Sequence, residues 1–253
     1  MNKAKIALVT GGSRGLGRDM ALQLANKGLD VVLTFNSNKA EAEKVVAAVE
    51  AHSRKAIALQ LNVENSNNFE PFVENVQKVL RSKFEVEKFD FLINNAGTAA
   101  YASFAETTEA QFDSMMNIHL KGPFFLTQKL SFLMNDNGGI VNISTGLARF
   151  TTPGYAAYAT MKGAVETLTK YQAKHFGDKK IRVNVVAPGA IETDFGGGVV
   201  RDNKELNAYI ASSTSLGRVG LADDIGGVVA FRCTDDAKWI NAQRIEVSGG
   251  VNF

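Results

Sequence analysis

The amino-acid sequence predicts an α/β protein: a single doubly wound domain over residues 1–253, with about seven parallel strands in one sheet and helices on both faces. Three observations predict this fold. Short apolar runs alternate with stretches of helical periodicity, which is typical of βαβ units. A glycine-rich segment follows the first apolar run directly. The 253 residues, 45% of them hydrophobic, are enough for one large core.

Seven apolar runs are the expected strands, and helical patterns separate them. In chain order they are Ile6 to Thr10, Asp30 to Thr34, Ala56 to Gln60, Phe89 to Ile93, Gly139 to Ile143, Arg182 to Val186 and Arg244 to Val247. In a parallel sheet of this kind, ligands bind at the carboxyl ends of the strands. The segments after the first and fourth strands are therefore the expected ligand site.

The segment after the first strand predicts a nucleotide site of the Rossmann type. Its order is Thr-Gly-x-x-x-Gly-x-Gly, and a helical pattern from Arg18 to Lys27 follows. Glycines permit a tight turn and close approach of the backbone, and the helix amino terminus offers free N–H groups to a pyrophosphate. A purely structural turn is the alternative. The candidate cofactor residues here are Gly11, Ser13, Arg14, Gly15, Leu16 and Gly17.

The end of the second strand bears on the choice of cofactor because it carries no carboxylate. An acidic residue at this point usually binds the ribose 2′-hydroxyl of NAD(H) and would repel the 2′-phosphate of NADP(H). Asn36 and Ser37 can instead donate hydrogen bonds to phosphate oxygens, and Arg14 can swing toward the same corner. The pattern favours NADP(H) over NAD(H). The alternative for Arg14 is an exposed turn residue without a partner.

Tyr158 and Lys162 stand four positions apart in a stretch that reads as a helix, so their side chains fall on one face. An ammonium near a phenol stabilises the phenolate and lowers the phenol pKa from about 10. Tyr158 could then exchange a proton with a carbonyl or carbinol oxygen. Taken alone, this spacing is weak evidence, because such pairs are more often chance surface contacts.

Four motifs together resemble the short-chain dehydrogenase/reductase family across essentially the whole chain. They are the glycine segment, Asn94 to Gly97 after the fourth strand, Tyr158-x-x-x-Lys162, and Pro188-Gly189 after the sixth strand. The resemblance implies hydride transfer between the nicotinamide of NADP(H) and a carbonyl or alcohol, with Tyr158 exchanging the proton. Lys162 would lower the tyrosine pKa and hold the nicotinamide ribose. A 3-oxoacyl thioester, a small ketone or a sugar would each fit as substrate.

The resemblance also implies further residues at the cofactor and the substrate oxygen. Those along the cofactor are Asn62, Val63, Asn95, Ala96, Gly97, Pro188, Gly189, Ile191 and Thr193. Family members usually hold the substrate oxygen with a serine thirteen positions before the tyrosine, where this chain has Thr145. A threonine hydroxyl can donate the same hydrogen bond. The adjacent Ser144 is the alternative if the register shifts, and Thr145 is favoured.

His119 stands where the family commonly has an asparagine whose main-chain carbonyl holds a water near the catalytic lysine. Because that task falls to the main chain, a histidine can conserve it, and its imidazole could also relay protons. The alternative is a histidine packed in the core. The segment Glu192 to Gly220 is glycine-rich and irregular, and it is predicted to be a substrate lid rather than a mere exposed insertion.

Composition excludes several other classes of protein. The net charge of +2 gives no basic face for nucleic acid. The first residues run into the first strand without a leader pattern, and no apolar run is long enough for a membrane, so a cytoplasmic protein without a membrane partner is expected. Cys233 is the only cysteine, and no cluster of ligand residues predicts a metal.

The helix from Met161 to Lys174, with Ala164, Val165 and Leu168, and the run from Arg244 to Phe253 resemble surfaces through which family members assemble. A symmetric homotetramer is expected, with a dimer as the alternative. Two other functions remain open. One is an NAD-dependent alcohol or sugar dehydrogenase. The other is a dinucleotide-binding scaffold without catalysis, against which the presence of both Tyr158 and Lys162 argues.

Overall fold

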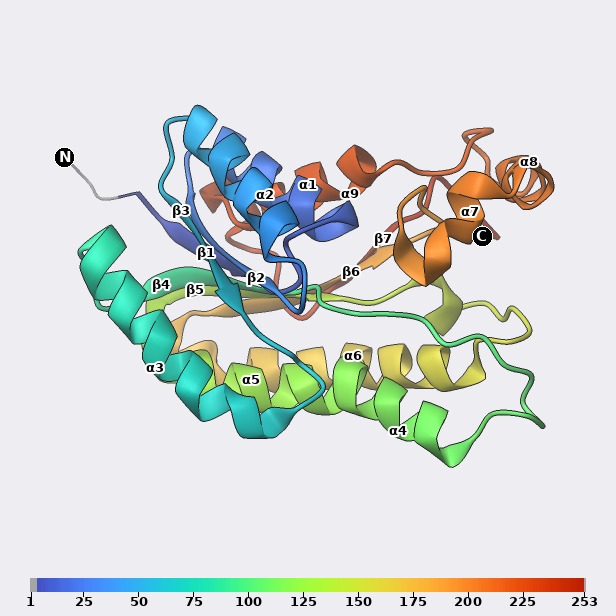
Figure 1. Cartoon of the computed structure of the whole chain (residues 1–253), viewed down its shortest axis with the longest axis horizontal. Coiled ribbons are helices and arrows are strands. Elements are labelled where there is room, and N and C mark those ends of the chain that lie inside the picture. The colour runs from blue at the N-terminus through green and yellow to red at the C-terminus, as the bar shows by residue number, and fades with distance from the viewer. Residues whose placement is uncertain (1–3, 253) are drawn as a thin grey trace.

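The computed structural model describes residues 4–252, which form three layers: a sheet between two layers of helices (Figure 1). The sheet has seven strands in the order β3-β2-β1-β4-β5-β6-β7, and all neighbours are parallel. The strands are β1 (Ile6–Val9), β2 (Asp30–Phe35), β3 (Ala56–Gln60), β4 (Phe89–Asn94), β5 (Met134–Ile143), β6 (Arg182–Pro188) and β7 (Arg244–Val247). The predicted doubly wound α/β fold is confirmed.

Helices cover both faces of the sheet (Figure 1). On one face lie α1 (Gly15–Asn26), α2 (Lys39–Ala51) and α9 (Ala222–Arg232), and on the other α3 (Phe69–Val79), α4 (Glu109–Met116), α5 (Gly122–Leu130) and α6 (Ala156–His175). Shorter helical turns connect them: η1 (Ser66–Asn68), η2 (Leu80–Phe84), η3 (Asn117–Lys121), η4 (Ser131–Leu133), η5 (Gly146–Ala148), η6 (Gly177–Lys179), η7 (Phe195–Gly198) and η8 (Asp235–Ala237). Two further helices, α7 (Val199–Asp202) and α8 (Lys204–Ser212), precede α9.

The central strands are mostly apolar because both faces of the sheet are covered. All four residues of β1 are buried. Ala7 and Val9 pack in the cluster under α1, α2 and α9, whereas Ile6 and Leu8 pack in the cluster under α3, α5 and α6. The two cores fix the sheet from both sides, and the carboxyl edge of the strands stays accessible.

The largest difference from the expected strands is at β5, which begins at Met134 rather than Gly139. Its pairing with β4 shifts register between Phe89 and Phe91, and Asn137 has φ +64°. Residues 135–138 are polar or glycine, so hydrophobicity alone does not predict a strand there. The carboxylate of Asp90 holds this stretch by accepting a hydrogen bond from Asn135 Nδ2 (3.0 Å).

A buried polar network fixes the sheet beneath its carboxyl edge. Asn94 Nδ2 donates to Asn142 Oδ1 (2.8 Å) and to Thr127 Oγ1 (3.0 Å), which joins β4, β5 and α5. Asn142 Nδ2 donates in turn to Thr169 and Gln172 on α6. Buried amides with several partners rigidify their surroundings, so the network holds α6 in a defined position against the sheet.

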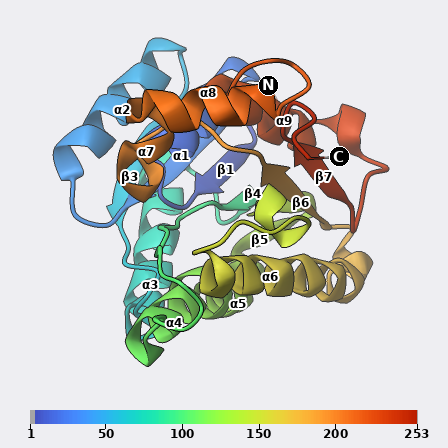
Figure 2. The same cartoon turned by 90° about the vertical axis from the view of Figure 1, so that its right-hand side faces the viewer.

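The segment predicted as a lid, 192–220, is more regular than its sequence suggests. It contains α7 and α8, and α8 begins at an Asn203 side chain that accepts a hydrogen bond from Leu206 N (3.0 Å). Figure 1 shows α7 and α8 at one end of the molecule, and Figure 2, which is viewed from that end, draws α8 in front of α1 and α2. Within residues 4–252, no helix has the length and apolarity that crossing a membrane requires. The prediction that the chain begins without a leader concerns its first residues, and residues 1–3 lie outside the described range.

Candidate active site

A cavity of about 1060 Å³ runs along the carboxyl edge of the sheet. Segments that follow β1, β2, β4, β5 and β6 line it, together with α7 and α8. Every candidate site residue contributes to this lining: Gly11, Ser13, Arg14, Gly15, Leu16, Gly17, Asn36, Ser37, Asn62, Val63, Asn95, Ala96, Gly97, His119, Ser144, Thr145, Tyr158, Lys162, Pro188, Gly189, Ile191 and Thr193. Candidate residues that are far apart in the sequence, from Gly11 to Thr193, therefore meet in one cavity.

The glycine segment is a tight turn that only glycine can build. Gly11 and Gly15 have φ of +65° and +52°, and a Cβ at Gly17 would lie 2.1 Å from the Gly11 oxygen. Arg14 precedes α1 in extended conformation, and no side chain in the described structure caps this helix start. Its first N–H groups are thus available to an anionic group, as a pyrophosphate site requires.

The end of β4 is tied to this glycine turn. Asn95 Nδ2 donates to the main-chain oxygens of Thr10 (2.9 Å) and Gly11 (3.1 Å). The Thr10 hydroxyl accepts hydrogen bonds from the main-chain N–H groups of Asn95 and Ala96. The Asn95 side chain therefore stabilises the glycine turn. Its predicted role along the cofactor stays a prediction.

Arg14 in the glycine turn and Asn36 and Ser37 after β2 are exposed and line the same cavity. The Arg14 guanidinium has no hydrogen bond or ion pair with another residue of the 4–252 range. Glu41, at the start of α2, also lines this corner, but its carboxylate lies 2.6 Å from Lys44 Nζ. The corner thus offers a free cation and several hydrogen-bond donors.

The structure distinguishes the two neighbouring hydroxyl groups after β5. The Thr145 side chain lies beside the Tyr158 phenol and lowers its pKa, whereas Ser144 Oγ donates to Glu166 Oε1 (2.7 Å) and is 2% exposed. Successive strand residues point to opposite faces, so only one of the two hydroxyls can face the phenol. Thr145 occupies the position beside Tyr158, and Ser144 points to the far side.

The Tyr158 and Lys162 side chains are both buried on α6. Lys162 Nζ donates to the main-chain oxygen of Ile143 (2.7 Å) and lies 5.7 Å from the Tyr158 ring centroid. Burial lowers the pKa of Lys162 to about 7, and burial raises the pKa of Tyr158, opposed by the Thr145 side chain beside it. Burial is the largest influence on the Tyr158 pKa in this structure, and the lowering of that pKa by Lys162 stays a prediction.

His119 is 1% exposed and packs its edge against the Tyr158 ring, 5.0 Å between centroids. Its Nε2 lies 2.7 Å from the Thr98 oxygen, so Nε2 carries the hydrogen. Burial and the nearby Lys162 hold its pKa well below the usual value. The imidazole is therefore neutral, and Nδ1 is a buried acceptor without a hydrogen-bond partner in the described residues.

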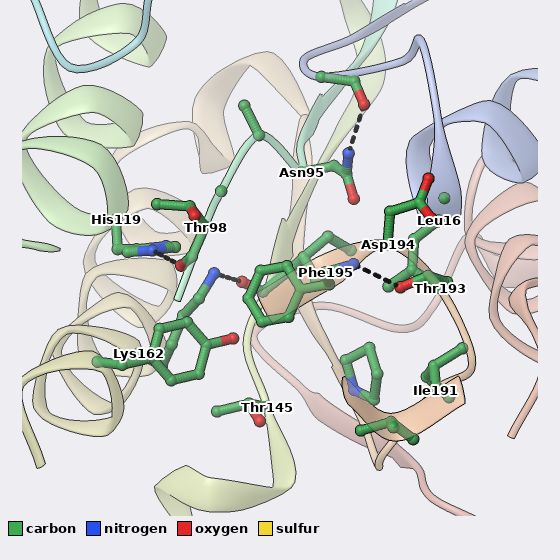
Figure 3. A pocket seen from close by; sticks show the side chains of 18 of the residues that line it. Leu16, Asn95, Thr98, His119, Thr145, Lys162, Ile191, Thr193, Asp194 and Phe195 are labelled. Atoms are coloured by element: carbon green, nitrogen blue, oxygen red, sulfur yellow. Dashed lines mark hydrogen bonds between the residues drawn. The ribbon is translucent and has the colours of Figure 1, made fainter. Parts of the chain in front are cut away.

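Residues after β6 close the other side of the cavity, as Figure 3 shows with Ile191, Thr193 and Asp194 opposite His119 and Lys162. Thr193 is 9% exposed and faces Gly15, with 3.5 Å between its Cβ and the position a Gly15 Cβ would take. Its hydroxyl accepts a hydrogen bond from Phe195 N (3.2 Å). The Phe195 ring lies between the two sides, 5.9 Å from that of Tyr158.

Several residues of the site were not predicted from sequence. Part of the lining, from the β5–α6 segment and the predicted lid, is aromatic and aliphatic: Leu147, Phe150, Tyr155, Phe195, Val199, Leu206, Tyr209 and Ile210. The sequence hints at an apolar lining only through Phe150, Phe195 and Val199, and no motif marks the other five. Val251 and Asn252 also line the cavity. No local motif marks Val251 and Asn252, because they reach the site only through the position of the segment after β7.

Fold and site together define a class: a Rossmann-type α/β protein with a buried tyrosine–lysine pair in its edge cavity. The family model described as enoyl-(acyl carrier protein) reductase matches residues 11–252. The chain belongs to the short-chain dehydrogenase/reductase family of oxidoreductases.

Three similar proteins illustrate the relationship. The 3-oxoacyl-[acyl-carrier-protein] reductase of Staphylococcus aureus is 35% identical, with 99% of each chain covered. Tetrahydroxynaphthalene reductase of Pyricularia oryzae is 34% identical over 98% of this chain and 90% of its own. The structure of the angucycline C-6 ketoreductase LanV with bound NADP has a TM-score of 0.93 at 32% identity, covering 98% of this chain and 96% of that one.

Proposed function

We propose that this protein is an NADP(H)-dependent reductase that converts a ketone to an alcohol, with Tyr158 as the proton donor. The observation that carries the proposal is the joint placement of Tyr158, Thr145 and Lys162 in the cavity that the glycine turn borders. A phenol that keeps its proton at neutral pH is suited to donate it to a carbonyl oxygen. The function therefore needs a hydride donor in the same cavity.

The residues around the glycine turn fit a dinucleotide. The turn leaves room where side chains would clash, and the uncapped start of α1 can accept a pyrophosphate. The free Arg14 beside Asn36 and Ser37 favours a 2′-phosphate, and Lys44 offsets the charge of Glu41. That LanV binds NADP supports the same cofactor here.

The proposed mechanism divides the work among three side chains. When bound, NADPH would supply the hydride that the carbonyl carbon accepts. Thr145 and Tyr158 hydrogen-bond the carbonyl oxygen, and Tyr158 gives it a proton, which leaves an alcohol. Lys162, whose pKa is about 7, can then pass a proton toward the resulting phenolate. His119 stays neutral and holds the Thr98 main chain beside the pair.

The aromatic part of the cavity lining favours an aromatic or polycyclic ketone as substrate. Phe150, Tyr155, Phe195 and Tyr209 contribute aromatic side chains there, and such rings offer faces and edges to a flat substrate. The names of the naphthol reductase and the angucycline ketoreductase point to the same chemistry. A 3-oxoacyl thioester is the second candidate, favoured by the name of the Staphylococcus aureus relative.

A screen for cofactor oxidation tests this proposal. The purified protein is mixed with NADPH or NADH and with aromatic ketones, a 3-oxoacyl thioester, small ketones or a keto sugar. We expect NADPH to be oxidised fastest with an aromatic ketone. Faster oxidation of NADH would favour the alternative of an NAD-dependent dehydrogenase, and tight NADPH binding without turnover would favour a scaffold. The cytoplasmic location and the homotetramer stay predictions.

A further inference from the structure

The C-terminal tail, here residues 249–252, lies at the cavity rather than away from it. Val251 is 6% exposed, and both Val251 and Asn252 contribute to the cavity lining. The tail follows β7, which is the edge strand of the sheet. Its position is thus set by contacts with other segments, because no further strand continues the sheet beyond β7 among residues 4–252.

Arg149, in the segment between β5 and α6, holds the tail from one side. Its Nη1 donates to the Asn252 main-chain oxygen (2.5 Å), and its Nη2 donates to that of Val251 (2.9 Å). The same guanidinium binds both carboxylate oxygens of Glu246 on β7, at 2.6 and 2.8 Å. A planar guanidinium gives such a multiple contact a fixed geometry, which a lysine cannot reproduce.

The contact extends from β7 to the main chain of Thr145. Arg244 donates to Glu246 (2.7 Å) and to Glu166 on α6 (2.7 Å). Its Nη2 also donates to the main-chain oxygen of Thr145 (3.2 Å). The tail, β7, the start of the β5–α6 segment and α6 are therefore joined by one chain of charged hydrogen bonds, each of which is stronger than a neutral one.

The predicted lid holds the tail from the other side. Val251 forms an antiparallel bridge with Thr214. The main-chain N–H groups of Ser215 and Leu216 donate to the oxygens of Gly250 (3.3 Å) and Gly249 (3.1 Å). Gly249 has φ +64°, and a Cβ there would lie 2.9 Å from Thr214 Cγ2, so the close approach depends on glycine.

We propose that the C-terminal tail couples the lid to the Thr145 segment and forms a wall of the substrate pocket, which makes Arg149 a positioning residue that determines specificity. The inference rests on the proposed ketone reduction. Arg149 lies on the side of the pocket away from the glycine turn, since its partners are the tail and β7. Its loss should change how large ketones are held and leave cofactor binding unchanged.

Amide hydrogen exchange tests the coupling without any substrate. In Arg149→Gln, we expect the Ser215 and Leu216 amides to exchange about tenfold faster, because losing charged hydrogen bonds frees their acceptors. Arg149→Lys should give a smaller increase. Arg81→Gln is the matched control, since Arg81 forms an exposed pair with Glu87 (2.8 Å), and it should leave both amides unchanged. Equal exchange in Arg149→Gln and the parent would overturn the proposal.

Steady-state kinetics then test specificity. The ratio of kcat/KM for a polycyclic ketone to that for a small ketone should change about tenfold in Arg149→Gln, mainly through KM, while the Kd for NADPH stays the same. An unchanged ratio, or an equal change in the Kd for NADPH, would contradict the specificity role. A parent that reduces neither ketone would refute the proposed function, and the exchange rates would still decide whether the tail holds the lid.

Discussion

Lys162 Nζ lies 5.7 Å from the centroid of the Tyr158 ring and donates its hydrogen bond elsewhere, to the Ile143 main-chain oxygen. Both side chains are buried, and burial moves their pKa values in opposite directions: up for the tyrosine and down to about 7 for the lysine. At neutral pH the phenol keeps its proton, and the lysine is close to the midpoint of its titration. At neutral pH Tyr158 therefore holds the proton that the proposed reduction requires.

Lys162→Met should make the protein more stable and inactive. Each pKa unit corresponds to about 1.4 kcal/mol, so removing the buried amine should gain roughly 1–4 kcal/mol at pH 7. The unfolded lysine, with its ordinary pKa of 10.5, holds a proton that the folded one has lost above pH 7, so parent stability rises with pH in this window. Urea denaturation should show that Lys162→Met is more stable than the parent by a larger margin at pH 7 than at pH 10. A variant less stable than the parent at pH 7 would refute the burial cost.

The two hydroxyls after β5 should respond differently to removal. Thr145→Val should lower kcat at least about a hundredfold, because the group that orients the carbonyl oxygen is lost. Ser144→Ala should leave kcat within a few fold and instead cost about 1 kcal/mol of stability, because Glu166 loses a hydrogen-bond donor. Kinetics and thermal melts on both variants separate the effects. A larger loss of kcat in Ser144→Ala would mean that the wrong hydroxyl has been assigned to the substrate.

Arg14→Ala should weaken NADPH selectively. A charge-assisted contact with the 2′-phosphate is worth roughly 1.5–3 kcal/mol, or about ten- to a hundredfold in Kd. NADH binding should hardly change, and Asn36→Asp should shift the preference toward NADH by repulsion. Because Arg14 is exposed, the selectivity should fall as salt rises. Titrations of parent and variant with NADPH and with NADH measure both Kd values. An equal loss of affinity for the two cofactors would show that Arg14 only shapes the turn.

Assembly is predicted to involve the layer of α4, α5 and α6. Val165 does not contribute as the sequence suggests, since it is 2% exposed and belongs to the core of the protomer. Exposed aromatics in this layer are Phe112, Phe124 and Tyr171 (41, 42 and 74%), which association would cover. Light scattering should give the mass of a tetramer, and Phe124→Asp should lower it. A monomeric parent at micromolar concentration would contradict the prediction.

Local patterns predict most of the fold, because the strands are buried on both faces and read as apolar runs. The bounds of β3 and β7 match the sequence prediction, whereas β5 starts earlier, where polar residues pair across a register shift. The sequence predicts those residues of the site that belong to recognisable motifs, such as the glycine segment and the Tyr158–Lys162 pair. The Arg149–Glu246 contact joins residues 97 positions apart, and no periodicity encodes such a pairing. The pKa shifts depend on burial depth, which a sequence pattern does not specify.

The most direct test of the central claim is Tyr158→Phe, which removes the proposed proton donor and keeps the ring. The measurement compares NADPH oxidation with the best ketone of the screen in parent and variant, together with the Kd for NADPH. We expect kcat to fall by about a thousandfold or more with Kd nearly unchanged, since only the transition state loses an interaction. Turnover within tenfold of the parent would show that another group supplies the proton, and the proposed mechanism would be wrong.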